Sequence, residues 1–356
     1  MKRLLEILID NLTKSRDELG FDWRTCWSKV TPESDGRVVV DVSRPEQLQA
    51  LESVAGDFGV MGKSVGELVM RSRAGVEILG RVAGASSGTV LWVVSSVADL
   101  RREPEHSAEL LTQAIMGETL TLLETRGDWF FVMMDDHYHG WIRSWYVSET
   151  PLDVVRSFAA EASARIEARV SYVLSSPEEN SIPVTDVTAG TLVKVEIRKN
   201  GFATVQLPGG KSGFLKDDAL SDPVCSKDRR SRVVERAGHF AGIPYIWGGT
   251  SAKGFDCSGL VKRVFAMEGV DLPRDADQQS VLGRMIPYED LGGALPGDLL
   301  FFGEGGKITH VSIVLGEGKF VHAYGDVRFN SYLPDDELYE EKLAGKLLFG
   351  RSIIDP

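Results

Sequence analysis

Two runs of short strands, near residues 90–150 and 165–220, place the strongest constraint on how this chain can fold. Three phrases of the first run return in the same order in the second, each 73 residues later: Gly117-Glu118-Thr119-Leu120 and Gly190-Thr191-Leu192, Gly127-Asp128-Trp129 and Asn200-Gly201-Phe202, Gly140-Trp141-Ile142 and Gly213-Phe214-Leu215. A constant offset indicates a duplicated module. Short strands separated at regular intervals by turn residues predict a small β-barrel for each copy.

Length and composition set the outer limits. A chain of 356 residues exceeds one ordinary hydrophobic core, which predicts about two to four domains. The content of 43% hydrophobic and 26% charged residues is typical of a globular protein. The net charge of −12 argues against nucleic-acid or anionic-membrane binding, and no stretch has the length of a membrane span. Nothing in the sequence indicates an oligomeric state.

The cysteines and the N-terminus bear on location. Cys26, Cys225 and Cys257 form an odd set without paired spacing, which argues against a disulfide framework and favours a reducing compartment. The first ten residues are basic and then apolar, but Glu6 and Asp10 interrupt the apolar run. They predict an amphipathic helix rather than a signal peptide. We therefore expect a cytoplasmic protein; a secreted or cell-envelope location is the alternative if an export signal has been removed.

The remaining regions divide the chain into four parts. Residues 1–89 predict an α-rich region with helices near 1–19, 45–57 and 64–79 and a strand at 37–42, and no chemistry can be assigned to it. The first barrel takes 90–150, and a charged helical connector with the second barrel takes 151–222. Residues 223–356 have a third composition, with helices, a glycine-rich loop and strands.

One cysteine of this last part stands where a glycine-rich loop meets a predicted helix. The loop reads Tyr245-Ile246-Trp247-Gly248-Gly249-Thr250, Cys257 follows in Gly254-Phe255-Asp256-Cys257-Ser258-Gly259, and residues 260–266 are amphipathic. A sulfur at a helix N-terminus meets unpaired N–H groups and the positive end of the helix dipole. That environment lowers a thiol pKa and favours the thiolate. Cys257 is therefore a candidate nucleophile.

A nucleophilic thiol needs a base, and the base needs an orienting group. His310 and His322 lie on two predicted strands separated by the turn residues 316–318. Pairing the strands symmetrically about Gly316 sets the histidines opposite each other on one face, with Cβ atoms about 4.5–5.5 Å apart. We therefore predict contact between the imidazoles, with Cys257 as nucleophile, His310 as base and His322 as orienter. The structural alternative is a polar histidine pair and a buried cysteine.

These residues belong to a longer series of motifs. The series is Pro244-Tyr245-Ile246-Trp247-Gly248-Gly249, Phe255-Asp256-Cys257-Ser258-Gly259-Leu260-Val261, Leu272-Pro273-Arg274-Asp275, Gln278-Gln279, Leu295-Pro296-Gly297-Asp298-Leu299-Leu300-Phe301-Phe302, His310-Val311-Ser312-Ile313 and Val321-His322-Ala323. It resembles the NlpC/P60 cysteine peptidases over about the last 130 residues. The duplicated modules resemble bacterial SH3 (SH3b) domains. The whole layout resembles the murein-peptide endopeptidases that cut γ-D-glutamyl–L-diamino-acid bonds.

The resemblance implies an α+β, papain-like catalytic domain in which the Cys257 helix packs on an antiparallel sheet that carries both histidines. Cys257 would attack the scissile carbonyl, and His310 would take the thiol proton and return one to the leaving amine. His322 would fix the tautomer of His310. The N–H of Cys257 and the hydroxyl of Tyr245 would stabilise the oxyanion. No cofactor is implied, and the His137–His139 pair lacks the further ligands that a metal site needs.

The resemblance also marks residues for the substrate, a murein-derived peptide. Asp256 suits a free α-amine, with helix N-capping as its alternative role. Ser258, Arg274 and Asp275 occupy positions that the family uses in its specificity pocket, and Arg274 has a structural ion pair as its alternative. Ala276 stands where several relatives have serine, which leaves the fit to the D-Glu carboxylate open. Tyr138 of the first module matches a tyrosine that closes the amine end of the cleft.

From these residues we predict a cysteine endopeptidase for the γ-D-glutamyl–diamino-acid bond of free L-Ala-γ-D-Glu-diamino-acid peptides, acting in recycling. A secreted hydrolase that remodels intact wall is the first alternative. The second is a wall-binding adaptor with an inactive peptidase domain.

Overall fold

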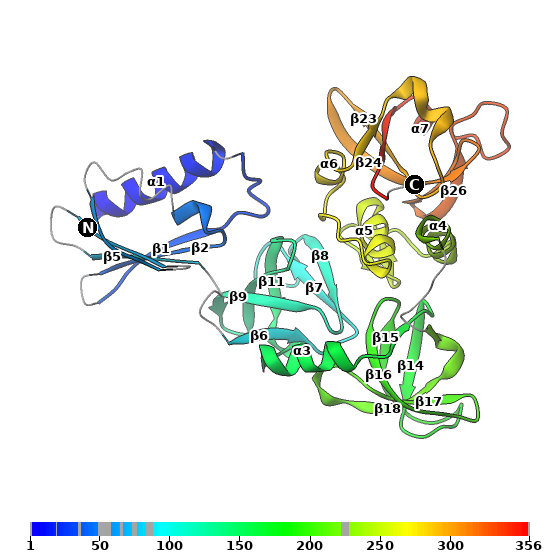
Figure 1. Ribbon diagram of the computed structural model, residues 1–356, viewed down its shortest axis with the longest axis horizontal. Coiled ribbons are helices and arrows are strands. Elements are labelled where there is room, and N and C mark those ends of the chain that lie inside the picture. Colours follow the sequence, from blue (N-terminus) through cyan, green and yellow to red (C-terminus); the bar gives the residue numbers. More distant parts are fainter. Residues whose placement is uncertain are drawn as a thin grey trace. The chain divides into compact units, whose positions relative to one another are not determined.

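The computed structural model describes residues 2–18, 20–34, 37–48, 58–64, 67–72, 77–82, 88–221 and 228–354. Its contacts divide the chain into two compact units. The first comprises Met1–Leu91, Thr119–His139 and Glu149–Leu152, and the second comprises Trp92–Glu118, Gly140–Ser148 and Asp153–Pro356. Figure 1 follows the elements along the chain.

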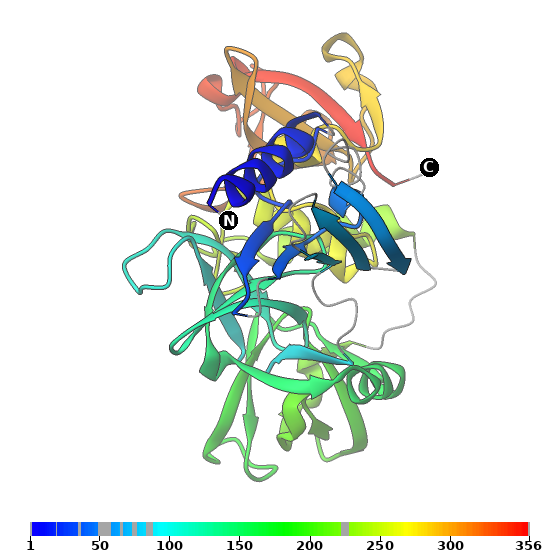
Figure 2. The same ribbon diagram turned by 90° about the vertical axis from the view of Figure 1, so that its left-hand side faces the viewer.

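The N-terminal region is an α/β layer rather than the mostly helical region that the sequence predicts. Helix α1 (Lys2–Glu18) buries Leu8 and Leu12 and lies along a five-stranded sheet (Figures 1 and 2). The sheet order is β1-β2-β5-β4-β3, with β1 (Ser28–Pro32), β2 (Val38–Val42), β3 (Phe58–Ser64), β4 (Glu67–Ser72) and β5 (Glu77–Val82).

Three of the four elements that the sequence predicts for this region can be compared with the structure, and the helix expected at 1–19 is confirmed as α1. The strand expected at 37–42 is confirmed as β2, which pairs parallel with β5. The helix expected at 64–79 is wrong, because the described residues of that range belong to strands β3, β4 and β5. Short apolar runs fit either period, and here pairing with β2 and with each other decides for strands. Most of the helix expected at 45–57 lies outside the described residues.

The duplicated modules reproduce each other strand by strand. Strands β7 (Val97–Arg101), β8 (Leu110–Ile115), β9 (Thr119–Arg126), β10 (Trp129–Met133) and β11 (His139–Arg143) return 73 residues later as β14 (Val170–Leu174), β15 (Pro183–Thr188), β16 (Leu192–Lys199), β17 (Phe202–Gln206) and β18 (Ser212–Lys216). Gly117 and Gly190 share a φ of +97°, a conformation that favours glycine. The repeat is therefore structural.

Each copy forms a seven-stranded sheet. The first has the order β12-β6-β9-β10-β11-β7-β8, with β6 (Thr89–Val93) and β12 (Val147–Pro151). The second has the order β15-β14-β18-β17-β16-β13-β19, with β13 (Ala164–Ile166) and β19 (Leu220–Ser221). The predicted connector is helix α3 (Leu152–Glu161).

The C-terminal part is α+β. Its sheet has the order β22-β27-β23-β24-β25-β26, formed by β22 (Arg284–Ile286), β23 (Leu299–Glu304), β24 (Lys307–Gly316), β25 (Lys319–Tyr324), β26 (Asp326–Ser331) and β27 (Leu347–Ser352). The helices are α4 (Arg229–His239), α5 (Cys257–Met267), α6 (Ala276–Gln279) and α7 (Glu341–Ala344), and a small hairpin joins β20 (Thr250–Ser251) to β21 (Gly254–Phe255).

One core fixes α5 on this sheet. Leu260, Val261 and Phe265 of α5 are fully buried in the same cluster as Val311 and Val321 of β24 and β25. The expected arrangement, a cysteine-bearing helix packed on an antiparallel sheet that carries both histidines, is confirmed.

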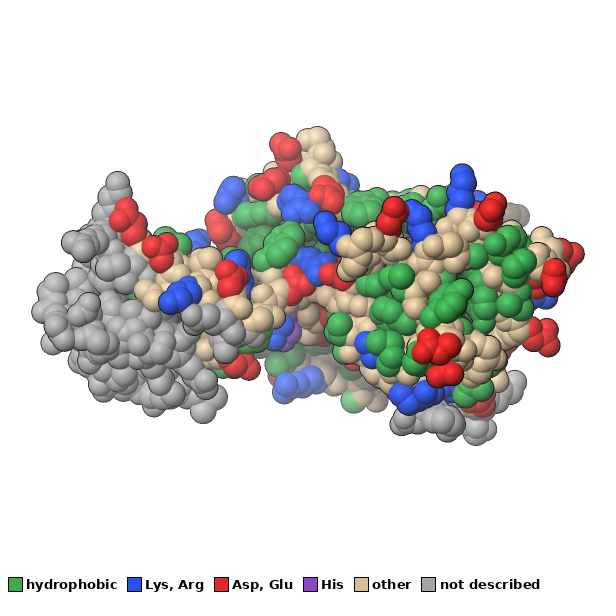
Figure 3. Space-filling view, turned by 90° about the horizontal axis from the view of Figure 1, so that it is seen from above, with side chains coloured by type: hydrophobic (Ala, Val, Ile, Leu, Met, Phe, Trp, Pro, Cys, Tyr) green, Lys and Arg blue, Asp and Glu red, His purple; other side chains and the backbone are tan. Residues whose placement is uncertain are grey.

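The surface gives two further observations. On the face shown in Figure 3, acidic and basic side chains are interspersed over the described residues rather than gathered into one patch of a single sign. Within the described part of the chain, no helix combines the length and apolar character needed to cross a membrane.

Candidate active site

Cys257 is the first residue of α5, and glycines let the preceding loop pack closely against it. The carboxylate of Asp256 caps the helix by accepting the N–H of Gly259 at 2.7 Å. A Cβ atom on Gly259 would come within 2.0 Å of the carbonyl oxygen of Gly249. Only glycine allows this approach, so the glycine-rich sequence seats the loop directly on the first turn of α5.

Burial favours the neutral form of the Cys257 thiol over the thiolate. The N–H groups of Val311 and Ser258 lower its pKa, but burial outweighs them and, with the nearby charge of Asp256, raises the pKa to about 12. The expectation that the helix terminus produces a thiolate is therefore wrong. The helix N–H groups are present, but Cys257 is a buried residue, only 9% exposed.

The two histidines are in contact, as predicted. His310 Nε2 lies 2.7 Å from His322 Nδ1, and both residues are buried. Their rings meet edge to face, with centroids 5.0 Å apart. Val311, whose N–H interacts with the Cys257 thiol, is the next residue after His310. One strand therefore supplies both an N–H for the sulfur and the candidate base.

The register that produces this contact differs from the predicted one. Glu317 and Gly318, with φ of 52° and 77°, form a tight turn that pairs Gly316 with Lys319. A bulge follows, after which Ile313 pairs with Val321. Continuing that register sets position 312, not His310, opposite His322. The imidazoles therefore meet diagonally on one face rather than directly across.

A third residue, Asn330, extends the histidine pair. Its Oδ1 lies 3.0 Å from His322 Nε2, and its Nδ2 donates to the carbonyl of Leu338 at 3.1 Å. Because the amide nitrogen is used at Leu338, Oδ1 accepts a proton from His322 Nε2. His322 Nδ1 is then an acceptor, so His310 Nε2 donates to it. His310 Nδ1 keeps its lone pair and is the ring atom able to take a proton.

Sequence reasoning missed Asn330, although a signal existed. Strand β26 pairs with β25 so that Asn330 lies opposite Phe320, two residues from His322 and on its face. A polar residue at that register would have been found by extending the hairpin argument one strand further.

Both imidazoles are neutral near pH 7. Burial lowers the pKa of His310 to about 3, and the neighbouring His322 adds to this effect. Burial also lowers the pKa of His322 to about 4, although its hydrogen bond with Asn330 acts in the opposite direction. The tautomer assignment above requires this neutral pair.

Tyr245 lies close to the thiol. Its N–H donates to the carbonyl of Gly325 at 2.9 Å, which fixes the loop against the end of β25. Burial raises the pKa of its hydroxyl, and its interactions with the neighbouring Cys257 and Asp256 groups add to this shift. The hydroxyl therefore stays protonated and is a hydrogen-bond donor. Its part in an oxyanion hole stays a prediction.

Asp256, the residue before the nucleophile, forms a buried ion pair with Arg274. Arg274 is 2% exposed, and both of its terminal nitrogens bond the carboxylate of Asp256. The same carboxylate also accepts N–H groups from Gly248 at 2.9 Å and from Gly259. The alternative roles that the sequence left open, N-cap for Asp256 and ion pair for Arg274, are both present, and their contact with substrate stays a prediction.

Ser258 and Asp275 complete this cluster. The Ser258 hydroxyl accepts from Arg274 at 2.9 Å and lies 3.3 Å from Asp256 Oδ1. Asp275 caps α6 through a capping box with Gln278. These contacts hold the two segments in place, and their role toward substrate stays a prediction as well.

Strand β8 of the first module borders this site within the second unit. Thr112 Oγ1 accepts from Arg274 Nε at 3.0 Å, and the Gln113 carbonyl accepts from the hydroxyl of Thr250 at 2.8 Å. Glu109 accepts from the indole N–H of Trp247 at 3.0 Å. The sequence carried no signal for these contacts, because they join segments more than 130 residues apart.

Tyr138 belongs to the first unit, whereas the catalytic candidates belong to the second. Its side chain is buried and its N–H donates to Asp136 Oδ1 at 3.0 Å. The proposal that it closes the cleft stays a prediction. Across the described residues, no group of three or more His, Cys, Asp or Glu side chains could hold a metal ion.

A buried thiol at a helix start, beside a strand that carries a polarised imidazole pair, defines a papain-like cysteine peptidase. Comparison with known proteins agrees. The NlpC/P60 family profile matches residues 242–346, and the profile described as the bacterial dipeptidyl-peptidase Sh3 domain matches residues 100–144. The chain belongs to the NlpC/P60 family.

Individual relatives cover more of the chain. It is 30% identical to the gamma-D-glutamyl-L-lysine dipeptidyl-peptidase of Bacillus subtilis over 224 residues. These residues cover 60% of this chain and 71% of the relative. It is 29% identical to dipeptidyl-peptidase 6 of Lysinibacillus sphaericus over 71% of this chain and 95% of that one. The crystal structure of an NlpC/P60 protein from Bacillus cereus matches with a TM-score of 0.63 at 20% identity, over 75% of this chain and all of that one.

Proposed function

We propose that this chain hydrolyses the γ-D-glutamyl–diamino-acid bond of murein peptides and that its substrates are free peptides beginning with L-Ala. The observation that carries the proposal is the hydrogen-bonded series Asn330–His322–His310 beside the buried Cys257. The name of the Bacillus subtilis relative, a gamma-D-glutamyl-L-lysine dipeptidyl-peptidase, supports the bond type. The relative from Lysinibacillus sphaericus is also named a dipeptidyl-peptidase. A dipeptidyl-peptidase by definition counts two residues from a free N-terminus.

The residues divide the chemistry as follows. The Cys257 thiol attacks the γ-carbonyl of D-Glu while His310 Nδ1 takes the thiol proton. The N–H groups at the start of α5 and the Tyr245 hydroxyl donate to the oxyanion. The proton held by His310 passes to the amine of the diamino acid, which leaves, and water then hydrolyses the thioester.

The preference for a free peptide rests on the surroundings of the loop. Strand β8 contacts Thr250 and Arg274, and Glu109, the residue before it, contacts Trp247. The first module therefore borders the side of the loop and of the Asp256–Arg274 cluster. A bordered site favours a short ligand with a defined end over a continuous polymer. Recycling of such peptides would take place in the cytoplasm.

The test compares three substrates by mass spectrometry of the products. L-Ala-γ-D-Glu-L-Lys, or its meso-diaminopimelate form, should yield L-Ala-D-Glu and the free diamino acid. The N-acetylated tripeptide should react at least about tenfold more slowly, because it lacks the ammonium group. Intact sacculi should yield little product; cleavage of sacculi alone would refute the free-peptide preference and support the wall-remodelling alternative.

Variants separate the chemistry from the specificity. Cys257→Ala should abolish hydrolysis of every substrate, whereas Cys26→Ala, at a buried thiol of the first unit, should leave it unchanged. Retained hydrolysis by Cys257→Ala would overturn the nucleophile assignment. No hydrolysis by the native protein would favour the adaptor.

A further inference from the structure

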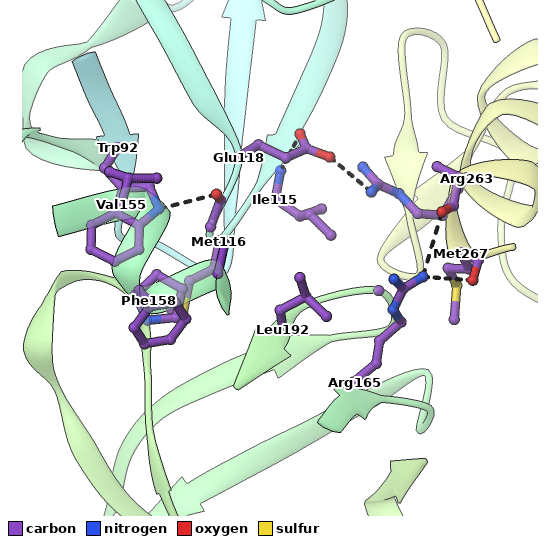
Figure 4. A pocket seen from close by; sticks show the side chains of 15 residues that line it. Trp92, Ile115, Met116, Glu118, Val155, Phe158, Arg165, Leu192, Arg263 and Met267 are labelled. Carbon is purple, nitrogen blue, oxygen red and sulfur yellow. Dashed lines mark hydrogen bonds and ion pairs between the residues drawn. The ribbon is translucent and has the colours of Figure 1, made fainter. Parts of the chain in front are cut away.

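A cavity of about 190 Å³ lies within the second unit, and the catalytic candidates are not among the residues that line it (Figure 4). Its walls come from the first module, helix α3, the second module and the C-terminal half of α5. No step of the proposed reaction uses this cavity.

One end of the cavity is aromatic and apolar. Trp92 and Phe158 meet edge to face with ring centroids 5.2 Å apart, and Ile115 and Leu192 continue the apolar wall (Figure 4). The indole N–H of Trp92 donates to the carbonyl of Gly117 at 3.0 Å. Because that polar atom is already satisfied, this end offers a ligand only apolar contact.

The other end carries an excess positive charge. Arg263 pairs with Glu118 at 2.8 Å, which leaves Arg165 as the second cation of the lining. Arg165 Nη1 donates to the carbonyls of Met267 at 2.6 Å and Ala266 at 3.4 Å. Among the ion pairs of the described residues, none includes Arg165. Burial accordingly lowers the pKa of Arg165.

The geometry of Arg165 suits a carboxylate. Both of its hydrogen bonds to protein use Nη1, so Nε and Nη2 remain available in the fixed fork that binds carboxylates with two parallel bonds. An engineered cavity of about 150 Å³ is known to hold benzene. The present cavity therefore has room for a ring or branched chain and a carboxylate.

We propose that this cavity binds a small carboxylate with an aromatic or branched apolar body. The carboxylate lies on Arg165 and the apolar body against Trp92 and Phe158. Three of the lining residues, Arg263, Ala266 and Met267, belong to α5, whose first residue is Cys257. The ligand would therefore contact the catalytic helix at the end opposite the nucleophile.

Three small probes test the two halves of the site on the full-length protein by calorimetric titration and thermal shift. Benzoate carries both features, benzamide keeps the ring without the charge, and acetate keeps the charge without the ring. Benzoate should bind with a Kd of roughly 1 mM or tighter. It should bind at least about tenfold tighter than either other probe and raise the melting temperature. Equal binding of benzoate and benzamide, or no binding of benzoate, would overturn the proposal.

Variants locate the bound probe. Arg165→Met should weaken benzoate at least about tenfold, whereas Arg156→Met, at an exposed arginine of α3 outside the lining, should change nothing. Ala159→Trp places a large ring at a lining position and keeps Arg165, so it should block benzoate even if Arg165→Met fails to fold. Equal affinities for Arg165→Met and Arg156→Met, or native affinity of Ala159→Trp, would show that benzoate binds elsewhere.

Discussion

The ion pair between Asp256 and Arg274 is the part of the site whose removal has the most predictable effect. Arg274 is 2% and Asp256 7% exposed, so each charge depends on the other rather than on water. Asp256→Asn keeps a capping oxygen but leaves Arg274 as a buried cation facing the hydroxyls of Ser258 and Thr112. Breaking a buried pair in this way costs about 3–5 kcal/mol of unfolding free energy.

The pair can be tested by a double-mutant cycle. Arg274→Met should also destabilise, because it strands the Asp256 carboxylate, although the N–H groups of Gly248 and Gly259 still solvate it. The double variant Asp256→Asn/Arg274→Met buries no net charge and should be more stable than the sum of the single effects predicts, by roughly 2–3 kcal/mol.

Urea unfolding followed by circular dichroism measures these differences, and Asp256→Asn should lower the midpoint by roughly 1–2 M. Arg328→Met is the matched control, since the Arg328–Asp326 pair is 47% and 42% exposed and should contribute less than about 1 kcal/mol. If the single effects simply add in the double variant, the argument that each charge depends on the other is refuted.

Three further predictions concern the catalytic residues. Asn330→Ala removes the acceptor that orients His322, so it should lower kcat by roughly tenfold to a hundredfold with little change in KM. Asn180→Ala, at an exposed position, is the control and should leave both constants unchanged. The pKa values of His310 and His322 are lowered in the folded protein, so only the unfolded imidazoles take up protons as the pH falls below about 6.5. The urea midpoint of unfolding should therefore fall between pH 7 and pH 4.5. The fall should be less steep in His322→Gln, which has lost one of the two imidazoles. The raised pKa of Cys257 predicts that its alkylation by iodoacetamide, followed by peptide mapping, still accelerates above pH 9; a plateau near pH 7 would contradict a neutral thiol.

The modules and the catalytic domain were predictable because their signals are local. The glycines around Cys257 and the alternation around His310 each follow from residues close together in the chain, and the 73-residue repeat compares two such local patterns. The same holds for the N-cap role of Asp256, which the spacing to Gly259 sets. Local geometry of this kind depends little on the rest of the fold.

The failures came where distant contacts decide. Strands β4 and β5 form where a helix was expected because they pair with each other and β5 pairs with Val38–Val42. The periodicity of their own residues does not decide between helix and strand. The histidine register moved by two residues because the turn uses Glu317 and Gly318 and a bulge follows. Contact between the imidazoles survived that error, since a shift of two residues keeps a side chain on the same face.

The ionisation of Cys257 shows the same division and changes how the catalytic residues must work. The helix start was read correctly, but the pKa of the thiol depends on burial by β24, which the local sequence does not show. The raised pKa of the thiol and the lowered pKa of His310 both favour the neutral forms, so we expect the proton to pass to His310 as the sulfur attacks. The direction of that movement is set by Asn330. Its fixed amide commits His322 Nδ1 to accept from His310 Nε2, so the lone pair of His310 lies on Nδ1, the atom to which the proposed mechanism assigns the thiol proton.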